Sequence, residues 1–244
     1  MERIHYGSDQ FQFADLRLPA GNGPHPVLIV IHGGFWRAKY DLEYIAPTCE
    51  AFTAGGVATW NIEYRRIGHP GGGWPGTLDD VAAAQDYLQS VAPRFHLDIN
   101  RVTAIGHSAG GHLALWLGSR KRALKGSIAL AGVVDLRRAW ELGLSNNVVR
   151  DFLGGSPEEV PDRYQFASPI ERLPLGIPQK LFHGTKDPNV PHEISERYVR
   201  TAHLRGDDAE LITLDDVGHF ELVDPRTQTF QLVRDAVLQM ATFL

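Results

Sequence analysis

Short runs of β-forming residues alternate along this chain with longer segments that have the periodicity of amphipathic helices. The clearest run, residues 27–31, is apolar throughout, which is typical of a strand covered on both faces. The other predicted strands lie at residues 10–18, 57–62, 102–105, 127–131, 179–182 and 210–214. The predicted helices lie at residues 42–54, 78–91, 109–117, 193–203 and 227–244. This alternation predicts an α/β fold, with a mostly parallel sheet and helices on both faces.

Two segments depart from that simple pattern. Residues 10–18 alternate between apolar and polar for part of their length, which predicts an antiparallel strand at the sheet edge or next to it. Residues 135–175 contain no clean strand pattern and several Pro and Gly breakers. A stretch of about 40 residues is too long for an ordinary connection, so we expect a small cap or lid inserted into a single domain of residues 1–244.

Composition narrows the class of protein. The 244 residues fit one globular domain, with 43% hydrophobic and 22% charged residues. The net charge of −5 gives no electrostatic footprint for nucleic acid. Neither a membrane-spanning run nor a secretory leader is visible. We therefore expect a cytoplasmic protein without nucleic-acid or membrane partners, and leave its oligomeric state open. The basic run at residues 120–125 is expected to be a solvated helix end.

Residues 106–111 read Gly-His-Ser-Ala-Gly-Gly, a G-x-S-x-G sequence between a predicted strand and a predicted helix. Such a strand–turn–helix elbow holds the serine in a strained turn, and the flanking glycines let neighbouring backbones approach closely. The N-terminus of the following helix favours developing negative charge. The sequence therefore predicts Ser108 as a nucleophile.

A serine hydroxyl needs a base that removes its proton and a carboxylate that orients the base. In the elbow fold the chain order is serine, acid, histidine. Asp187 follows the strand at 179–182, and His219 follows the strand at 210–214. We predict His219 as the base and Asp187 as its partner. Asp135, which also follows a strand, is the alternative acid.

A third motif, His32-Gly33-Gly34-Phe35-Trp36, directly follows the most apolar strand. Acyl transfer builds an oxyanion that needs preorganised backbone N–H donors. We assign the N–H groups of Gly34, Phe35 and Ala109 to this role and expect His32 to brace the loop. Three aromatic residues adjoin motif positions and are expected to line the substrate pocket: Trp36, Trp74 and Phe220.

No cofactor or metal is expected. The chain has no H-E-x-x-H motif, no paired cysteines, no P-loop and no dinucleotide-binding fingerprint. Its single cysteine, Cys49, excludes an internal disulfide.

Together these motifs resemble the α/β-hydrolases of the esterase/lipase group that carry an H-G-G oxyanion motif, from Leu28 to Phe220. Residues 63–66 and 74–81 are similar to the Y-R…F-P…D block of hormone-sensitive-lipase-like esterases. That group usually has glycine at the position of Phe35. The H-G-G-aromatic-W sequence is closer to that of kynurenine formamidases and bacterial feruloyl-esterase-like hydrolases.

The resemblance implies an α/β-hydrolase fold and a serine hydrolase of the carboxylesterase type. We expect it to cleave small esters with short or aromatic acyl groups through a Ser108–His219–Asp187 triad and an acyl-enzyme. The alternative is an arylformamidase that acts on N-formylkynurenine, an amide with an aromatic amine as leaving group. A hydrolase-fold module that only binds a ligand is a remote alternative, because such proteins usually lose a triad residue. An interfacial lipase or exopeptidase is disfavoured, because the short chain leaves room only for a modest cap.

Overall fold

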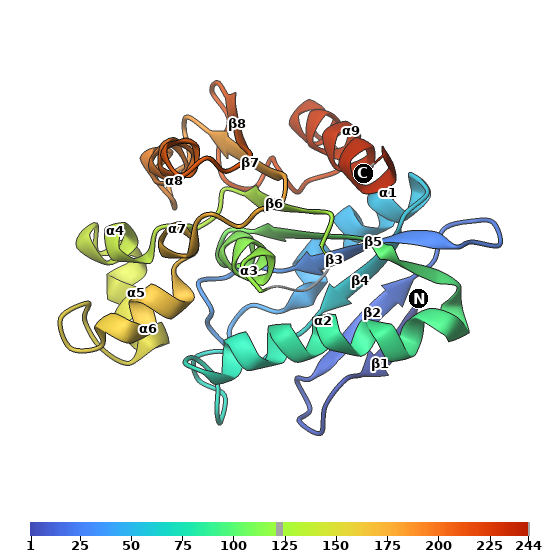
Figure 1. Cartoon of the computed structure of the whole chain (residues 1–244), viewed down its shortest axis with the longest axis horizontal. Coiled ribbons are helices and arrows are strands. Elements are labelled where there is room, and N and C mark those ends of the chain that lie inside the picture. The colour runs from blue at the N-terminus through green and yellow to red at the C-terminus, as the bar shows by residue number, and fades with distance from the viewer. Residues whose placement is uncertain (121–123, 244) are drawn as a thin grey trace.

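The computed structural model describes residues 1–120 and 124–243, so part of the basic run at 120–125 lies outside the described residues. These residues form one eight-stranded sheet in the order β1-β2-β4-β3-β5-β6-β7-β8 (Figure 1). The strands are β1 (Glu2–His5), β2 (Phe13–Arg17), β3 (His25–Ile31), β4 (Ala58–Ile62), β5 (Leu97–His107), β6 (Gly126–Leu130), β7 (Gln179–Gly184) and β8 (Ala209–Leu214). The predicted α/β architecture is confirmed.

The sheet is mixed at one edge only. β2 pairs antiparallel with both β1 and β4, whereas the pairs from β4 through β8 are all parallel. β2 is therefore the second strand from the edge, as its partial alternation predicted. The edge strand β1 was not predicted, because three of its four residues are exposed and Ile4 is its only apolar one.

Helices cover both faces of the sheet (Figure 1). α1 (Ala46–Ala54), preceded by a 3₁₀ turn at Leu42–Ile45, packs with α9 (Gln228–Phe243) on one face. α2 (Gly76–Phe95), α3 (Ala109–Gly118) and α8 (Glu193–Leu204) cover the other face. The neighbouring β3 residues Leu28 and Ile29 point into these two separate apolar clusters. This two-sided burial explains why β3 has no polar alternation.

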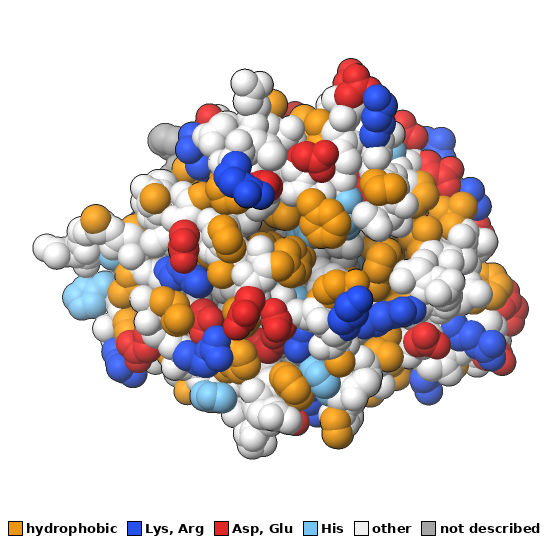
Figure 2. Space-filling view, turned by 180° about the vertical axis from the view of Figure 1, so that it is seen from behind, with side chains coloured by type: hydrophobic (Ala, Val, Ile, Leu, Met, Phe, Trp, Pro, Cys, Tyr) orange, Lys and Arg blue, Asp and Glu red, His pale blue; other side chains and the backbone are white. Residues whose placement is uncertain are grey.

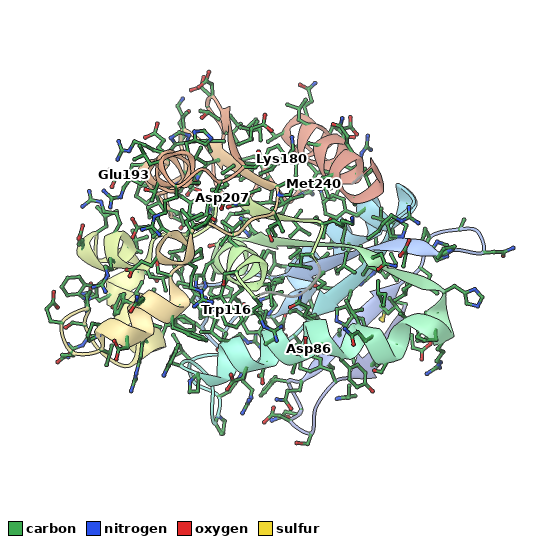
Figure 3. The ribbon with its side chains drawn as sticks, viewed as in Figure 1. Asp86, Trp116, Lys180, Glu193, Asp207 and Met240 are labelled. Carbon is green, nitrogen blue, oxygen red and sulfur yellow. The ribbon has the colours of Figure 1, made fainter. Side chains whose placement is uncertain are left out.

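The segment at 135–175 consists of short helices, and no strand is found among its residues, all of which the structure describes. The helices are α4 (Leu136–Glu141), α5 (Leu144–Leu153), α6 (Pro161–Ala167) and α7 (Pro169–Arg172). They gather beside one end of α3, at the left of Figure 1. Trp116 of α3, labelled in Figure 3, donates its indole N–H to the Phe166 carbonyl at 3.1 Å. The role of this segment as a cap stays a prediction.

The carboxyl ends of the parallel strands meet along one edge of the sheet. The loops after β3, β5, β7 and β8 carry the predicted oxyanion loop, Ser108, Asp187 and His219, respectively. Open α/β sheets place ligands at this edge, so the topology positions all three motifs for a common site.

Candidate active site

Ser108 occupies the sharp turn between β5 and α3. Its backbone has φ 57° and ψ −119°, a conformation that costs a residue with a side chain about 1–3 kcal/mol. The flanking glycines are required by close backbone contacts. A Cβ on Gly106 would lie 2.1 Å from the Gly110 carbonyl oxygen, and one on Gly110 would lie 2.0 Å from the Ile31 carbonyl oxygen. The G-x-S-x-G sequence thus follows from how tightly the elbow is packed against β3.

His219 and Asp187 form a hydrogen-bonded pair. The distance from His219 Nδ1 to Asp187 Oδ2 is 2.6 Å, and the histidine is 5% exposed. The other carboxylate oxygen, Oδ1, accepts the backbone N–H groups of Asn189 and Val190 at 2.8 and 2.9 Å. Burial tends to raise the pKa of Asp187, but hydrogen bonds from His183 and His219 outweigh it and hold that pKa well below its usual range. The ionised Asp187 accepts a hydrogen bond from His219 Nδ1–H, which leaves Nε2 without a proton and able to accept one.

Ser108 and His219 line the same cavity of about 310 Å³. Its other lining residues are Gly34, Phe35, Tyr40, Tyr44, His107, Asn189 and Phe220. The alternative acid, Asp135, is engaged elsewhere. Its Oδ1 accepts the Arg138 backbone N–H at the start of α4, and its Oδ2 lies 3.1 Å from Arg197 Nε.

The loop after β3 lies directly against Ser108. A Cβ added to Gly33 would come within 2.9 Å of Ser108 Cβ. The Gly33 N–H donates to the Tyr44 hydroxyl at 2.6 Å, so it is already occupied. Among the residues that the structure describes, neither the Gly34 nor the Phe35 N–H donates to a protein group. Both of these residues line the cavity, as an oxyanion-binding pair would require.

His32 braces this loop from behind. Its Nε2 lies 3.0 Å from Glu63 Oε1, and its ring stacks on Tyr64 with 4.4 Å between ring centroids. The Tyr64 hydroxyl donates to the His32 carbonyl oxygen at 2.8 Å. Burial acts to raise the pKa of Glu63, but His32 and Arg66 lower it on balance, so the carboxylate is charged. The supporting role of Glu63 was not predicted, although it begins the Glu-Tyr-Arg-Arg block at 63–66.

A chain of three hydrogen bonds joins the predicted oxyanion loop to the loop of His219. The Tyr44 hydroxyl accepts the Gly33 N–H. The same hydroxyl lies 3.0 Å from His107 Nδ1. His107 Nε2 lies 2.9 Å from the His219 carbonyl oxygen and must donate to it, so Nδ1 accepts the Tyr44 proton. Burial, assisted by His219, lowers the pKa of His107 to about 3, which keeps its ring neutral. Sequence analysis missed Tyr44, because it falls in a predicted helix with no motif around it.

We expect Tyr44→Phe to lower the free energy of unfolding by about 1–3 kcal/mol, because it leaves the Gly33 N–H and His107 Nδ1 without partners. Urea denaturation measures the change. Tyr40→Phe is the matched control, since Tyr40 lines the same cavity but its hydroxyl makes no hydrogen bond within the described part of the chain. Equal stabilities for the two variants would contradict a role for this network.

The model of the BD-FAE family matches residues 14–201. The chain belongs to the BD-FAE family. It is 28% identical to esterase LipC of Mycobacterium tuberculosis, covering 91% of this chain and 60% of the relative. It is 25% identical to a probable isoprenylcysteine alpha-carbonyl methylesterase of Arabidopsis thaliana, covering 90% and 50%. The chain therefore spans about half to three fifths of these relatives.

Solved structures show the same fold as this BD-FAE member. A truncated carbohydrate esterase from gut microbiota superposes with a TM-score of 0.84 at 23% identity, covering 98% of this chain and 95% of that one. Thermogutta terrifontis esterase 2, phosphonylated by sarin, gives a TM-score of 0.82 at 22% identity, covering 100% and 95%. The predicted α/β-hydrolase fold is confirmed.

Two of the three aromatic residues expected in the substrate pocket of this BD-FAE member lie elsewhere. Trp36 is fully buried, stacks on Phe152 at 4.5 Å and donates its indole N–H to His112 Nδ1 at 3.2 Å. Trp74 packs edge-on against Phe166 at 5.3 Å and does not line the cavity. Both therefore hold the 135–175 segment against the domain, and a contact of either residue with substrate stays a prediction. Phe220, which is 59% exposed, does line the cavity.

The described residues contain no cluster of three or more His, Cys, Asp or Glu side chains that could hold a metal ion. A search of the same residues finds no helix long and apolar enough to cross a membrane. On the face seen in Figure 2, acidic and basic side chains are interspersed between apolar ones. The basic side chains do not gather into one continuous patch on this face.

Proposed function

We propose that this BD-FAE family member is a serine-dependent carboxylic ester hydrolase with Ser108, His219 and Asp187 as its catalytic triad. The observation that carries the proposal is the hydrogen bond of 2.6 Å between His219 Nδ1 and Asp187 Oδ2. His219 also lines the same cavity as Ser108. Its similarity to proteins named as esterases supports the same reaction class. A cytoplasmic location and independence from any cofactor stay predictions of the sequence.

In the proposed mechanism, Ser108 Oγ attacks the ester carbonyl carbon while His219 Nε2 takes the hydroxyl proton. The carbonyl oxygen becomes an oxyanion bound by the N–H groups of Gly34, Phe35 and Ala109. When this intermediate collapses, the C–O bond to the alcohol breaks and His219 gives its proton to the leaving oxygen. Water then attacks the acyl-enzyme, again through His219, releasing the carboxylic acid and restoring Ser108. The Asp187 carboxylate stabilises the imidazolium in both halves.

The cavity favours small substrates. Its volume of about 310 Å³ lies at the lower end for small-molecule sites. Its walls include the rings of Phe35, Tyr40 and Phe220, which suit short or aromatic acyl groups. We therefore propose small short-chain or aromatic acyl esters as the substrate class, and residues 135–175 as a cap on a single catalytic domain.

An arylformamidase is the second candidate. One half of the chain is 32% identical to the kynurenine formamidase of Meyerozyma guilliermondii, over 50% of this chain and 44% of that protein. The triad would act in the same way on N-formylkynurenine. A comparison of kcat/KM for formylkynurenine and p-nitrophenyl acetate, with Ser108→Ala as the blank, separates the two. Turnover of formylkynurenine alone would replace the esterase proposal, and turnover of neither would favour a binding protein.

We expect kcat/KM to fall with a slope of one as the pH is lowered, because a protonated His219 accepts no proton from Ser108. Asp187, whose pKa is held well below its usual range, stays ionised through this interval. His107, with its pKa lowered to about 3 by burial, stays neutral. Initial rates with p-nitrophenyl acetate over about pH 5–8 measure this profile. A flat profile would argue against His219 as the base, and a slope of two would implicate a second group.

A further inference from the structure

A second cavity of about 470 Å³ adjoins the one that contains Ser108. It lies between the start of α1 and the connection from β8 to α9. Its lining residues are Tyr44, Pro47, Phe220, Val223, Asp224, Pro225 and Arg226. Tyr44 and Phe220 also line the first cavity, so the two spaces meet at these two residues.

The proposed chemistry determines which end of an ester lies near Phe220. The leaving oxygen receives its proton from His219 and must lie beside that ring. The ring of Phe220 packs edge-on against the His219 ring, with 5.1 Å between centroids. A group attached to the leaving oxygen can therefore contact Phe220, which also lines the second cavity. The acyl group is left with the walls formed by Phe35 and Tyr40.

The walls of the second cavity determine what it can bind. They are mostly apolar, and its two charged residues neutralise each other. The Arg226 guanidinium donates to both carboxylate oxygens of Asp224 at 2.8 and 2.7 Å. These hydrogen bonds lower the pKa of Asp224 to about 2, so the ion pair persists at neutral pH. A cavity with apolar walls and an internally paired rim favours a neutral, apolar group over a charged one.

Hydrogen bonds hold the backbone of two residues that line this cavity, Val223 and Asp224. The hydroxyl of Thr48 in α1 donates to the Val223 carbonyl oxygen at 2.5 Å, which ties the β8–α9 connection to α1. The hydroxyl of Thr227 donates to the Asp224 carbonyl oxygen at 2.9 Å. Preformed concave sites bind without the cost of ordering a loop.

We propose that this second cavity is a leaving-group subsite that binds the alcohol portion of the substrate as a neutral alkyl or aryl group. The proposal rests on the ester hydrolase function proposed above. A subsite of this kind makes the enzyme selective for the alcohol of an ester as well as for its acid. The larger of the two cavities then binds the alcohol portion.

Two ester series test the subsite. One combines acetic acid with ethanol, butanol or hexanol, and the other combines ethanol with acids of the same lengths. We expect kcat/KM to rise along the alcohol series by up to about fourfold for each methylene buried. The acid series is expected to level off or fall, because the first cavity is smaller.

Pro47→Trp tests the location, because Pro47 is an exposed residue in the first turn of α1 that lines only the second cavity. A tryptophan there fills the space without touching the triad. We expect kcat/KM for hexyl acetate to fall at least tenfold and that for ethyl acetate to stay within twofold. Leu204→Trp, an 83% exposed position at the end of α8, is the matched control and should leave both substrates unchanged.

A second measurement does not depend on turnover. Ser108→Ala protein should bind hexyl acetate more tightly than ethyl acetate by calorimetry, and Pro47→Trp in that background should remove the difference. An alcohol series without a trend, a loss in Pro47→Trp that is equal for all substrates, or a trend in the acid series alone would overturn the subsite. Absence of hydrolysis for every ester, ethyl acetate included, would instead remove the proposed function and the subsite with it.

Discussion

Ser108→Ala is expected to lower kcat for p-nitrophenyl acetate more than ~10³-fold while leaving the protein folded. The substitution removes only the hydroxyl oxygen, and alanine meets the same backbone strain at φ 57° as serine does. The elbow stays in place because its contacts are made by the backbone. Ser108 N–H donates to the Leu130 carbonyl oxygen at 2.8 Å, and the Ser108 carbonyl oxygen accepts the His112 N–H at 3.2 Å. Steady-state rates and a thermal melt by circular dichroism measure the two halves of this prediction.

A fluorophosphonate probe provides the direct control, because it reacts only with an activated serine. Peptide mapping should find the label on Ser108 in the wild type and no label in Ser108→Ala. Ser119→Ala is the matched substitution, since Ser119 lies at the end of the same helix, away from the elbow. A label on another serine, or full activity in Ser108→Ala, would exclude the proposed mechanism.

The sequence predicted the parts of the fold and site that depend on backbone packing. The all-apolar run that became β3 could only be a strand covered on both faces, and its burial is complete. The two glycines around Ser108 stand where backbones approach too closely for a larger residue, Gly106 beside Gly110 and Gly110 beside Ile31. Asp187 follows β7 and His219 follows β8. These two strands are neighbours in the sheet, as expected for strands joined by one short, regular crossover.

The sequence did not predict the direction in which individual side chains point. Phe35 and Trp36 are consecutive and both have positive φ, yet Phe35 lines the cavity and Trp36 is buried against His112 and Phe152. An aromatic residue beside a motif is equally compatible with either placement. Tyr44 was missed for a related reason, because its hydrogen bonds to Gly33 and His107 depend on where the 3₁₀ turn at Leu42–Ile45 lies in the folded chain. The edge strand β1 has a single apolar residue, Ile4, which is too little for a strand to be predicted.

The second large effect on kcat is expected from replacing the carboxylate that orients His219. Asp187→Asn is expected to lower kcat by up to ~10⁴-fold at neutral pH. The asparagine carbonyl oxygen can still accept the N–H groups of Asn189 and Val190, as Oδ1 does now. Its NH₂ group then faces His219 Nδ1 in place of Oδ2. Nδ1 has to accept that hydrogen bond, so the imidazole proton moves to Nε2, where it blocks the acceptance of the Ser108 proton.

Asp135→Asn is the control for this assignment, because Asp135, which follows β6, is the alternative acid. Its carboxylate caps α4 and pairs with Arg197, so its loss should reduce stability slightly and lower kcat less than about tenfold. Thermal melts of both variants separate a loss of activity from a loss of folding. A larger loss of kcat in Asp135→Asn than in Asp187→Asn would assign the acid to Asp135. The roles of Ser108 and His219 would stand even then, because the elbow and the shared cavity do not depend on which carboxylate orients the imidazole.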